Sequence, residues 1–89
     1  MGFFSGNDKV TYKEFRKVIF RLKESGFSET EREEVASAFR GDLHESSSGA
    51  GISKEEMKKG LHWLKEHPGH HHLSPDQLVK LEETLRRYL

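Results

Sequence analysis

The chain has 89 residues, enough for one small domain with a single modest core. Its 15 lysines and arginines balance its 15 aspartates and glutamates, so net charge gives no reason to expect nucleic acid or an acidic membrane surface as partner. Cysteine is absent, which excludes disulfides and thiolate chemistry. No apolar run approaches the length of a membrane span and no signal peptide is apparent at the start, so we expect a cytoplasmic protein.

Four helices are predicted from one repeated start signal, a serine or threonine followed three residues later by glutamate or glutamine. Such a pair forms a capping box, in which the two side chains bind backbone N–H groups that lack partners at a helix start. The four pairs are Thr11 with Glu14, Ser28 with Glu31, Ser53 with Glu56, and Ser74 with Gln77. Apolar residues on both sides of three of these boxes form hydrophobic staples, namely Val10 with Phe15, Ile52 with Met57, and Leu73 with Leu78.

Each predicted helix carries apolar residues on one face at helical spacing. In chain order these stripes are Phe15, Val18, Ile19 and Leu22; Val35, Ala36, Ala38 and Phe39; Met57, Gly60, Leu61 and Leu64; and Leu78, Leu81 and Leu85 with Tyr88 or Leu89. Gly26 should end the first helix, Gly41 the second and His67-Pro68-Gly69 the third, whereas the fourth should run to the chain end. No alternating segment has strand length, so the predicted fold class is all-α.

The two halves of the chain resemble each other. Residues 10–24 align without gaps on residues 52–66, and Ser28 with Glu31 matches Ser74 with Gln77. This pattern predicts two repeated helical hairpins in a single domain, residues 1–89, with an N-terminal tail at 1–9 and a central Ser/Gly loop at 41–52. The alternative is that capped amphipathic helices all share such features without true repetition.

The segment from Gly51 to Met57 reads Gly-Ile-Ser-Lys-Glu-Glu-Met and resembles the end of an EF-hand loop entering its exiting helix. Residues 7–15 look like the tail of a second such loop, so the resemblance covers about residues 7–66. It implies an EF-hand-like scaffold in which Ile52 pairs across loops, Val10 stands at the matching position, and Glu56 is the closing carboxylate.

The central loop departs from the calcium-binding pattern. Counting back twelve positions from Glu56 places Glu45 first but Ser47 third and Ala50 sixth, where the family has ligands and a glycine. Glu45 and Glu56 are therefore weak calcium candidates, although a longer loop starting at Leu43 and binding through backbone carbonyls would also fit. The competing interpretation is a flexible loop in which Glu56 only caps a helix.

Five of the six histidines lie between His62 and His72. Imidazole is a common ligand of zinc and nickel, so His67, His70 and His72 are candidate transition-metal ligands. The alternative is a solvated polar turn, since there is no cysteine and adjacent histidines point in different directions. We expect no cofactor.

No catalytic constellation and no phosphate-binding loop is recognisable, so we do not expect an enzyme. The helix that starts at Ser28 opens with four glutamates, which argues against nucleic acid as a partner. The sequence predicts a non-enzymatic protein-interaction module whose partner is another protein or a second copy, with no membrane involved. The alternative function is a metal-responsive binding protein, with calcium in the loop or zinc or nickel at the histidines.

Phe20 and Trp63 are the candidate partner-binding residues, because both lie off the apolar stripes. Large apolar side chains on an outer face form either a contact surface or a satellite of the core. The predicted groove is lined by Phe15, Ile19, Phe20, Phe39, Trp63 and Leu64. The competing interpretation is that packing of the four helices covers Phe20 and Trp63.

Overall fold

The computed structural model describes residues 9–43 and 51–89, which form four α-helices, a short 3-10 turn and one pair of two-residue strands. The helices are α1 (Tyr12–Glu24), α2 (Glu29–Leu43), α3 (Lys54–Glu66) and α4 (Pro75–Arg86), with the turn η2 (Pro68–His70) between α3 and α4. The strands are β1 (Lys9–Val10) and β2 (Ile52–Ser53). The predicted all-α class with four short helices is confirmed.

All four predicted capping boxes are formed. In α1 the Glu14 N–H donates to Thr11 Oγ1 at 3.1 Å, while the Thr11 N–H donates to Glu14 Oε1 at 3.0 Å. The same reciprocal bonds join Ser28 to Glu31, Ser53 to Glu56 and Ser74 to Gln77. Each box satisfies two backbone donors that helix geometry leaves unpaired, which explains why every helix starts where the sequence indicates.

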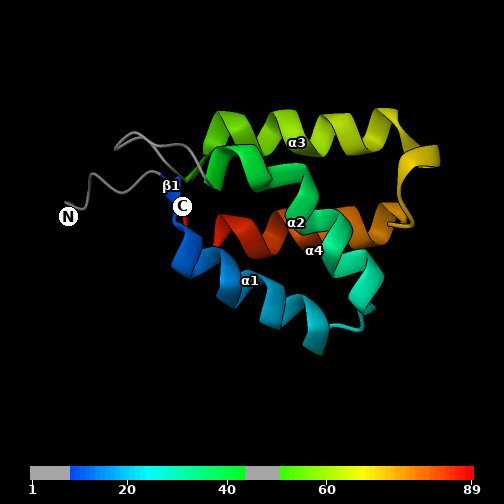
Figure 1. Ribbon diagram of the computed structural model, residues 1–89, viewed down its shortest axis with the longest axis horizontal. Helices are drawn as coiled ribbons and strands as arrows, with labels where there is room; N and C mark the ends of the chain where they lie inside the picture. Colours follow the sequence, from blue (N-terminus) through cyan, green and yellow to red (C-terminus); the bar gives the residue numbers. More distant parts are fainter. Residues whose placement is uncertain (1–8, 44–50) are drawn as a thin grey trace.

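The helices pack so that α1 and α3 lie on opposite sides of the bundle (Figure 1). Both α2 and α4 run between them, and each of these two helices packs against α1 as well as α3. The first helix of one hairpin is therefore separated from the first helix of the other. Surface residues of α1 and α3 consequently face different directions.

The core contains most of the residues that the stripes and staples predict, together with Phe27, whereas four stripe residues are only partly buried, namely Ile19, Ala36, Ala38 and Tyr88. Among the residues that the structure describes, fifteen apolar side chains are buried: Val10, Phe15, Val18, Leu22, Phe27, Val35, Phe39, Ile52, Met57, Leu61, Leu64, Leu73, Leu78, Leu81 and Leu85. Burial of each large aliphatic or aromatic side chain stabilises the fold by roughly 1.5–3 kcal/mol relative to exposure. The helices α2 and α3 approach closely at Gly60, because a Cβ atom there would lie 2.5 Å from Phe39 Cε1 and 2.7 Å from Cζ.

The boundaries of the predicted tail and central loop need correction. The helix α2 does not stop at Gly41 but continues to Leu43, since glycine lowers helix propensity by about 1 kcal/mol without forbidding the helix. Lys9 pairs with Ser53 and Val10 with Ile52 in an antiparallel ladder that neither predicted segment anticipated as strand. Gly51 permits this approach, with φ at 125° and its absent Cβ only 3.0 Å from Val10 O.

The ends of the helices follow local chemistry less closely than the starts. Gly26 ends the first hairpin's helix as predicted, with φ at 99° and the Phe27 N–H donating to Leu22 O at 3.0 Å. The prediction that α4 reaches the chain end is wrong, because the helix finishes at Arg86. Beyond it the Tyr88 N–H donates to Leu85 O, a tighter i to i+3 bond that closes the last turn.

Candidate functional site

A cavity of about 400 Å³ opens between α2 and α3, beside the connection to α4. We call it the Trp63 groove, and its lining residues are Thr30, Glu33, Glu34, Ser37, Ala38, Trp63, Leu64, His70 and His71. Trp63 is 45% exposed, whereas the neighbouring Leu64 belongs to the core. The groove therefore combines an accessible indole with an acidic edge on α2.

Two histidines hold the indole of Trp63. The imidazole of His67 stacks on it with ring centroids 4.5 Å apart and 20° between the planes, and His70 approaches at 5.8 Å in a tilted geometry. His67 Nδ1 lies 2.9 Å from the Trp63 carbonyl oxygen, which can only accept, so this nitrogen carries the hydrogen. The hydrogen bond to the backbone positions the imidazole of His67, and this imidazole packs on one face of the indole.

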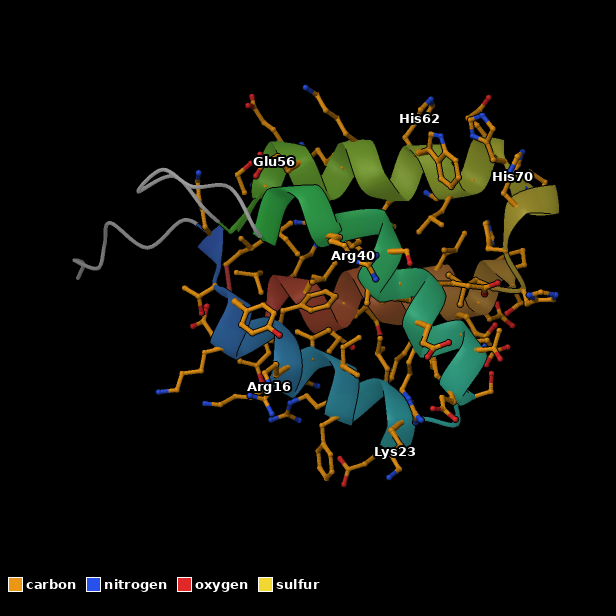
Figure 2. The ribbon with its side chains drawn as sticks, in the orientation of Figure 1. Arg16, Lys23, Arg40, Glu56, His62 and His70 are labelled. Atoms are coloured by element: carbon orange, nitrogen blue, oxygen red, sulfur yellow. The ribbon has the colours of Figure 1, made fainter. Side chains whose placement is uncertain are left out.

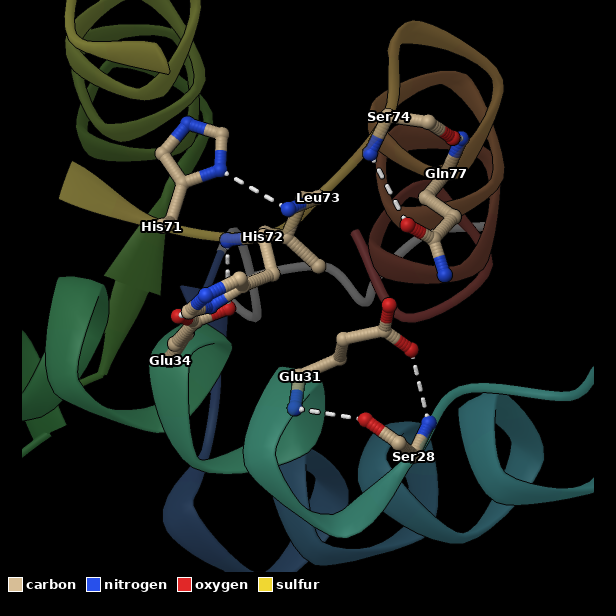
Figure 3. Close-up of polar contacts among 8 residues, drawn as sticks. All are labelled: Ser28, Glu31, Glu34, His71, His72, Leu73, Ser74 and Gln77. Atoms are coloured by element: carbon tan, nitrogen blue, oxygen red, sulfur yellow. Dashed lines mark hydrogen bonds and ion pairs between the residues drawn. The ribbon is translucent and has the colours of Figure 1, made fainter. Parts of the chain in front are cut away.

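His71 is a structural residue under the groove. It is only 8% exposed, its Nε2 donates to Leu64 O at 2.6 Å, and its Nδ1 accepts from the Leu73 N–H at 3.0 Å (Figure 3). An imidazole that donates from one nitrogen and accepts at the other is neutral. Both nitrogens are occupied, so His71 fixes the connection against α3.

Glu34 ties the same connection to α2. Its Oε1 accepts from the His72 backbone N–H at 2.9 Å, and its Oε2 lies 2.7 Å from His72 Nδ1 (Figure 3). Burial acts to raise the pKa of Glu34, but the backbone and imidazole hydrogen bonds from His72 outweigh it, so the pKa falls below its usual range. Glu34 thus stays ionised at neutral pH and keeps the edge of the groove negative.

A second surface cavity, of about 420 Å³, lies along α1 beside the end of the chain. We call it the Phe20 face, and its lining residues are Arg16, Lys17, Phe20, Arg21, Glu24 and Tyr88. Phe20 is 59% exposed, and Arg21 Nε donates to Tyr88 Oη at 3.2 Å, which joins α1 to the end of the chain. This surface is basic and carries an aromatic side chain.

The structure corrects the predicted groove. Phe20 and Trp63 are both exposed, so the interpretation that helix packing covers them is wrong. They do not share one groove, however, because α1 and α3 lie on opposite sides. Phe15, Phe39 and Leu64 are fully or almost fully buried, since the helical stripes that fill the core need them. Two separate aromatic surfaces replace the single predicted one.

The candidate metal ligands are only partly brought together. His67 and His70 are neighbours, with ring centroids 5.5 Å apart, whereas His72 faces Glu34 on α2. Within residues 9–43 and 51–89 no group of three or more histidine, aspartate or glutamate side chains is placed to hold a metal ion. The trio of His67, His70 and His72 is therefore not assembled as a site.

Of the two candidate calcium ligands, the structure describes Glu56 but not Glu45. Glu56 completes the capping box of α3, with its Oε1 accepting from the Ser53 N–H at 2.9 Å. It lies in the first turn of that helix (Figure 2). Glu45 falls outside the described residues. Calcium binding by this pair stays a prediction.

No local pattern in the sequence indicated Glu33, Glu34 or His71 as parts of a site. Glu34 and His72 are 38 positions apart, and local patterns carry no information at that separation.

Within the described part of the chain, no helix is long and apolar enough to cross a membrane. Comparisons of the chain with protein-family models, curated proteins and solved structures give no match.

Proposed function

We propose that this chain is a non-enzymatic module that binds another protein through exposed aromatic side chains on a small helical scaffold. The observation that carries the proposal is Trp63, a large apolar residue 45% exposed at the mouth of a cavity of about 400 Å³. Tryptophan beside a pocket is the residue type that most often dominates binding energy at protein interfaces. Phe20 provides a second, separate contact surface.

The rigidity of the site supports this proposal. His67 stacks on the indole, His71 fixes the connection to α3, and Glu34 fixes it to α2. A side chain that is already restricted loses little conformational entropy when a partner covers it. The groove is therefore prepared for binding before a partner arrives.

We also propose that the scaffold is EF-hand-like. The antiparallel pairing of Val10 with Ile52 supports this, since the resemblance puts these two residues at matching loop positions. Each strand is followed at once by a capped helix, which begins after Thr11 in one half and after Ser53 in the other. The proposed interaction function does not depend on whether the scaffold is EF-hand-like.

The test compares proteins captured by the wild-type chain with those captured by variants. Trp63→Ala should lose the bound partner, or weaken its binding by about tenfold or more, because a buried aromatic anchor is removed. The matched control is Val79→Ala, which trims a 55% exposed apolar residue of α4 and should leave binding unchanged. Circular dichroism should show that both variants keep the helical fold. An identical set of partners for the wild type, Trp63→Ala and Phe20→Ala would rule the proposal out.

A metal-responsive function is the second candidate. The observation that favours it is the Val10–Ile52 strand pair, which sets Glu56 at the start of α3 just after the central loop. It predicts that millimolar calcium raises the Tm and that Glu56→Gln abolishes the rise. Glutamine should preserve the capping box, as Gln77 does in α4, so this variant isolates metal binding from capping.

Calorimetric titration with calcium and then with zinc, at neutral pH, distinguishes the two candidate metal sites. Heat with calcium that disappears in Glu56→Gln supports the loop, and heat with zinc that disappears in His67→Ala supports the histidine turn. Absence of any heat or Tm shift with either ion ends the metal-responsive candidate and leaves the interaction module in place.

A further inference from the structure

We propose that the two aromatic surfaces bind each other between copies of this chain: the Phe20 face of one copy docks into the Trp63 groove of the next. This inference rests on the proposed function and names the partner as a second copy. It assigns the two surfaces complementary roles, with Phe20 as the inserted side chain and Trp63 as the wall that receives it.

The charges of the two surfaces are opposite. Around Phe20 the lining contains Arg16, Lys17 and Arg21 against Glu24. The described lining of the Trp63 groove contains two glutamates, Glu33 and Glu34, and no lysine or arginine. Complementary potentials of this kind favour the correct encounter and fix its orientation.

The shapes of the two surfaces also correspond. Arg16 and Lys17 lie four and three residues before Phe20, and Glu24 lies four residues after it, so they form one stripe on the outside of α1. A helix that places such a stripe in a groove is a common mode of protein recognition. Phe20 would then meet the pinned indole of Trp63, and aromatic pairs contribute about 0.5–1.5 kcal/mol beyond the area that they bury.

The topology decides the kind of assembly. Because α1 and α3 lie on opposite sides of the bundle, one copy can offer its Phe20 face to one neighbour and its Trp63 groove to another (Figure 1). Such a contact joins two different surfaces, so it produces a ring or an open chain rather than a closed symmetric dimer. The formal net charge of zero means that growth is not opposed by overall repulsion between copies.

The experiment is sedimentation of the full chain over a range of concentrations, with variants of each surface. Wild type should form species beyond the dimer as concentration rises, and higher salt should weaken them. Phe20→Ala and Trp63→Ala should each weaken self-association by about tenfold or more. Mixed together, these two variants retain one intact contact between them, so they should form a 1:1 complex and grow no further.

A charge exchange tests the same contact with substitutions at exposed positions. Lys17→Glu alone and Glu33→Lys alone should each stay monomeric, because like charges then face each other. An equimolar mixture should regain the wild-type association, since every contact between unlike copies pairs opposite charges again. This pair keeps the inference testable even if one of the aromatic variants fails to fold.

Three outcomes would overturn the inference. One is a wild-type chain that remains monomeric at several hundred micromolar. Another is a symmetric dimer that Phe20→Ala does not weaken, and the third is a charge-exchange mixture that stays monomeric.

A fluorescence titration then distinguishes failure of the self-association inference from failure of the proposed function. Trp63 is the single tryptophan, so its emission reports on the groove. If a synthetic cationic peptide carrying the sequence of residues 12–24 changes that emission while the chain stays monomeric, the partner is a different protein and the proposed function stands. If no peptide binds and both Trp63→Ala and Phe20→Ala capture the same partners as the wild type, both proposals fail.

Discussion

The two hairpins start in the same way and are completed differently. All four helices begin with a capping box, whereas the connections between helices share little. In the first hairpin Gly26 turns the chain with a positive φ and an exposed backbone. In the second, the chain passes through η2 and is held by the buried His71 and by Glu34. Helix starts are thus encoded by neighbours in sequence, whereas this connection also depends on Glu34, which lies 38 positions from His72.

The cores of the two hairpins also differ, at one pair of equivalent positions in α1 and α3. The gapless alignment of residues 10–24 on 52–66 places Val18 opposite Gly60. Val18 is fully buried, whereas the space beside Gly60 is filled by the ring of Phe39 from α2. In the first hairpin the helix fills this position with its own Val18. In the second hairpin Phe39 of α2 fills the equivalent position. Substitutions can test each part of this contrast.

The largest effect should come from giving the second hairpin the residue of the first. Gly60→Val would place side-chain atoms within the ring of Phe39, and overpacking of a closed core should lower the free energy of unfolding by about 3 kcal/mol. Urea denaturation monitored by circular dichroism measures this change. Adding Phe39→Leu should recover part of the loss, and strictly additive losses would contradict the assigned contact.

The buried histidine should come next. His71→Ala leaves the Leu64 carbonyl and the Leu73 N–H without their partner, which should cost about 2 kcal/mol. His71→Asn retains an acceptor near the position of Nδ1 and should cost less. Thermal unfolding compares the two variants, while Trp63 fluorescence reports whether the groove is disturbed. Equal losses in both would mean that the hydrogen bond to Leu73 contributes nothing.

The glycine turn of the first hairpin should give a smaller change. Gly26→Ala introduces a side chain at φ 99° with nothing within 4 Å of the new Cβ, so backbone strain alone should cost about 1 kcal/mol. Gly41 is the matched control, because it also has open space but lies inside α2. Gly41→Ala should stabilise the chain by up to about 1 kcal/mol. The same sign for both variants in denaturant titrations would refute this assignment.

The smallest effect should depend on pH. The pKa of Glu34 lies below its ordinary value of 4.5 in the folded chain, so ionised Glu34 stabilises the fold above the ordinary value. That contribution disappears as pH falls through the lowered pKa. We expect an advantage of a few tenths of a kcal/mol over Glu34→Gln at pH 7, which fades as the pH falls below the ordinary value and through the lowered pKa.

Tm values of the two chains across this range measure the difference. His72→Ala removes the imidazole partner and should reduce the acid-dependent part of it, while leaving the backbone bond to Glu34 possible. A difference between wild type and Glu34→Gln that does not change with pH would contradict the role assigned to the carboxylate.

Much of the fold follows from local sequence. The serine or threonine and glutamate or glutamine pairs determine the helix starts because both partners lie within one turn of each other. The apolar stripes determine the buried faces because helical spacing aligns residues three and four apart. Gly41 was misjudged as a stop, since the cost of one glycine is smaller than what the surrounding helix gains.

The candidate site follows much less from sequence. Phe20 and Trp63 could be singled out as residues outside the stripes, and their exposure agrees with that. Their separation could not be foreseen, because it depends on α2 and α4 running between α1 and α3. The acidic edge at Glu33 and Glu34 joins Trp63 only when α2 packs against α3.

The fold class, the helix starts and most of the core residues therefore follow from local sequence. Each of these depends on spacing within a helical turn. The pairing of Val10 with Ile52, the burial of His71 and the division of the aromatic residues between two surfaces of opposite charge arise from tertiary packing. These features depend on how helices far apart in the chain pack together, and local patterns do not record that.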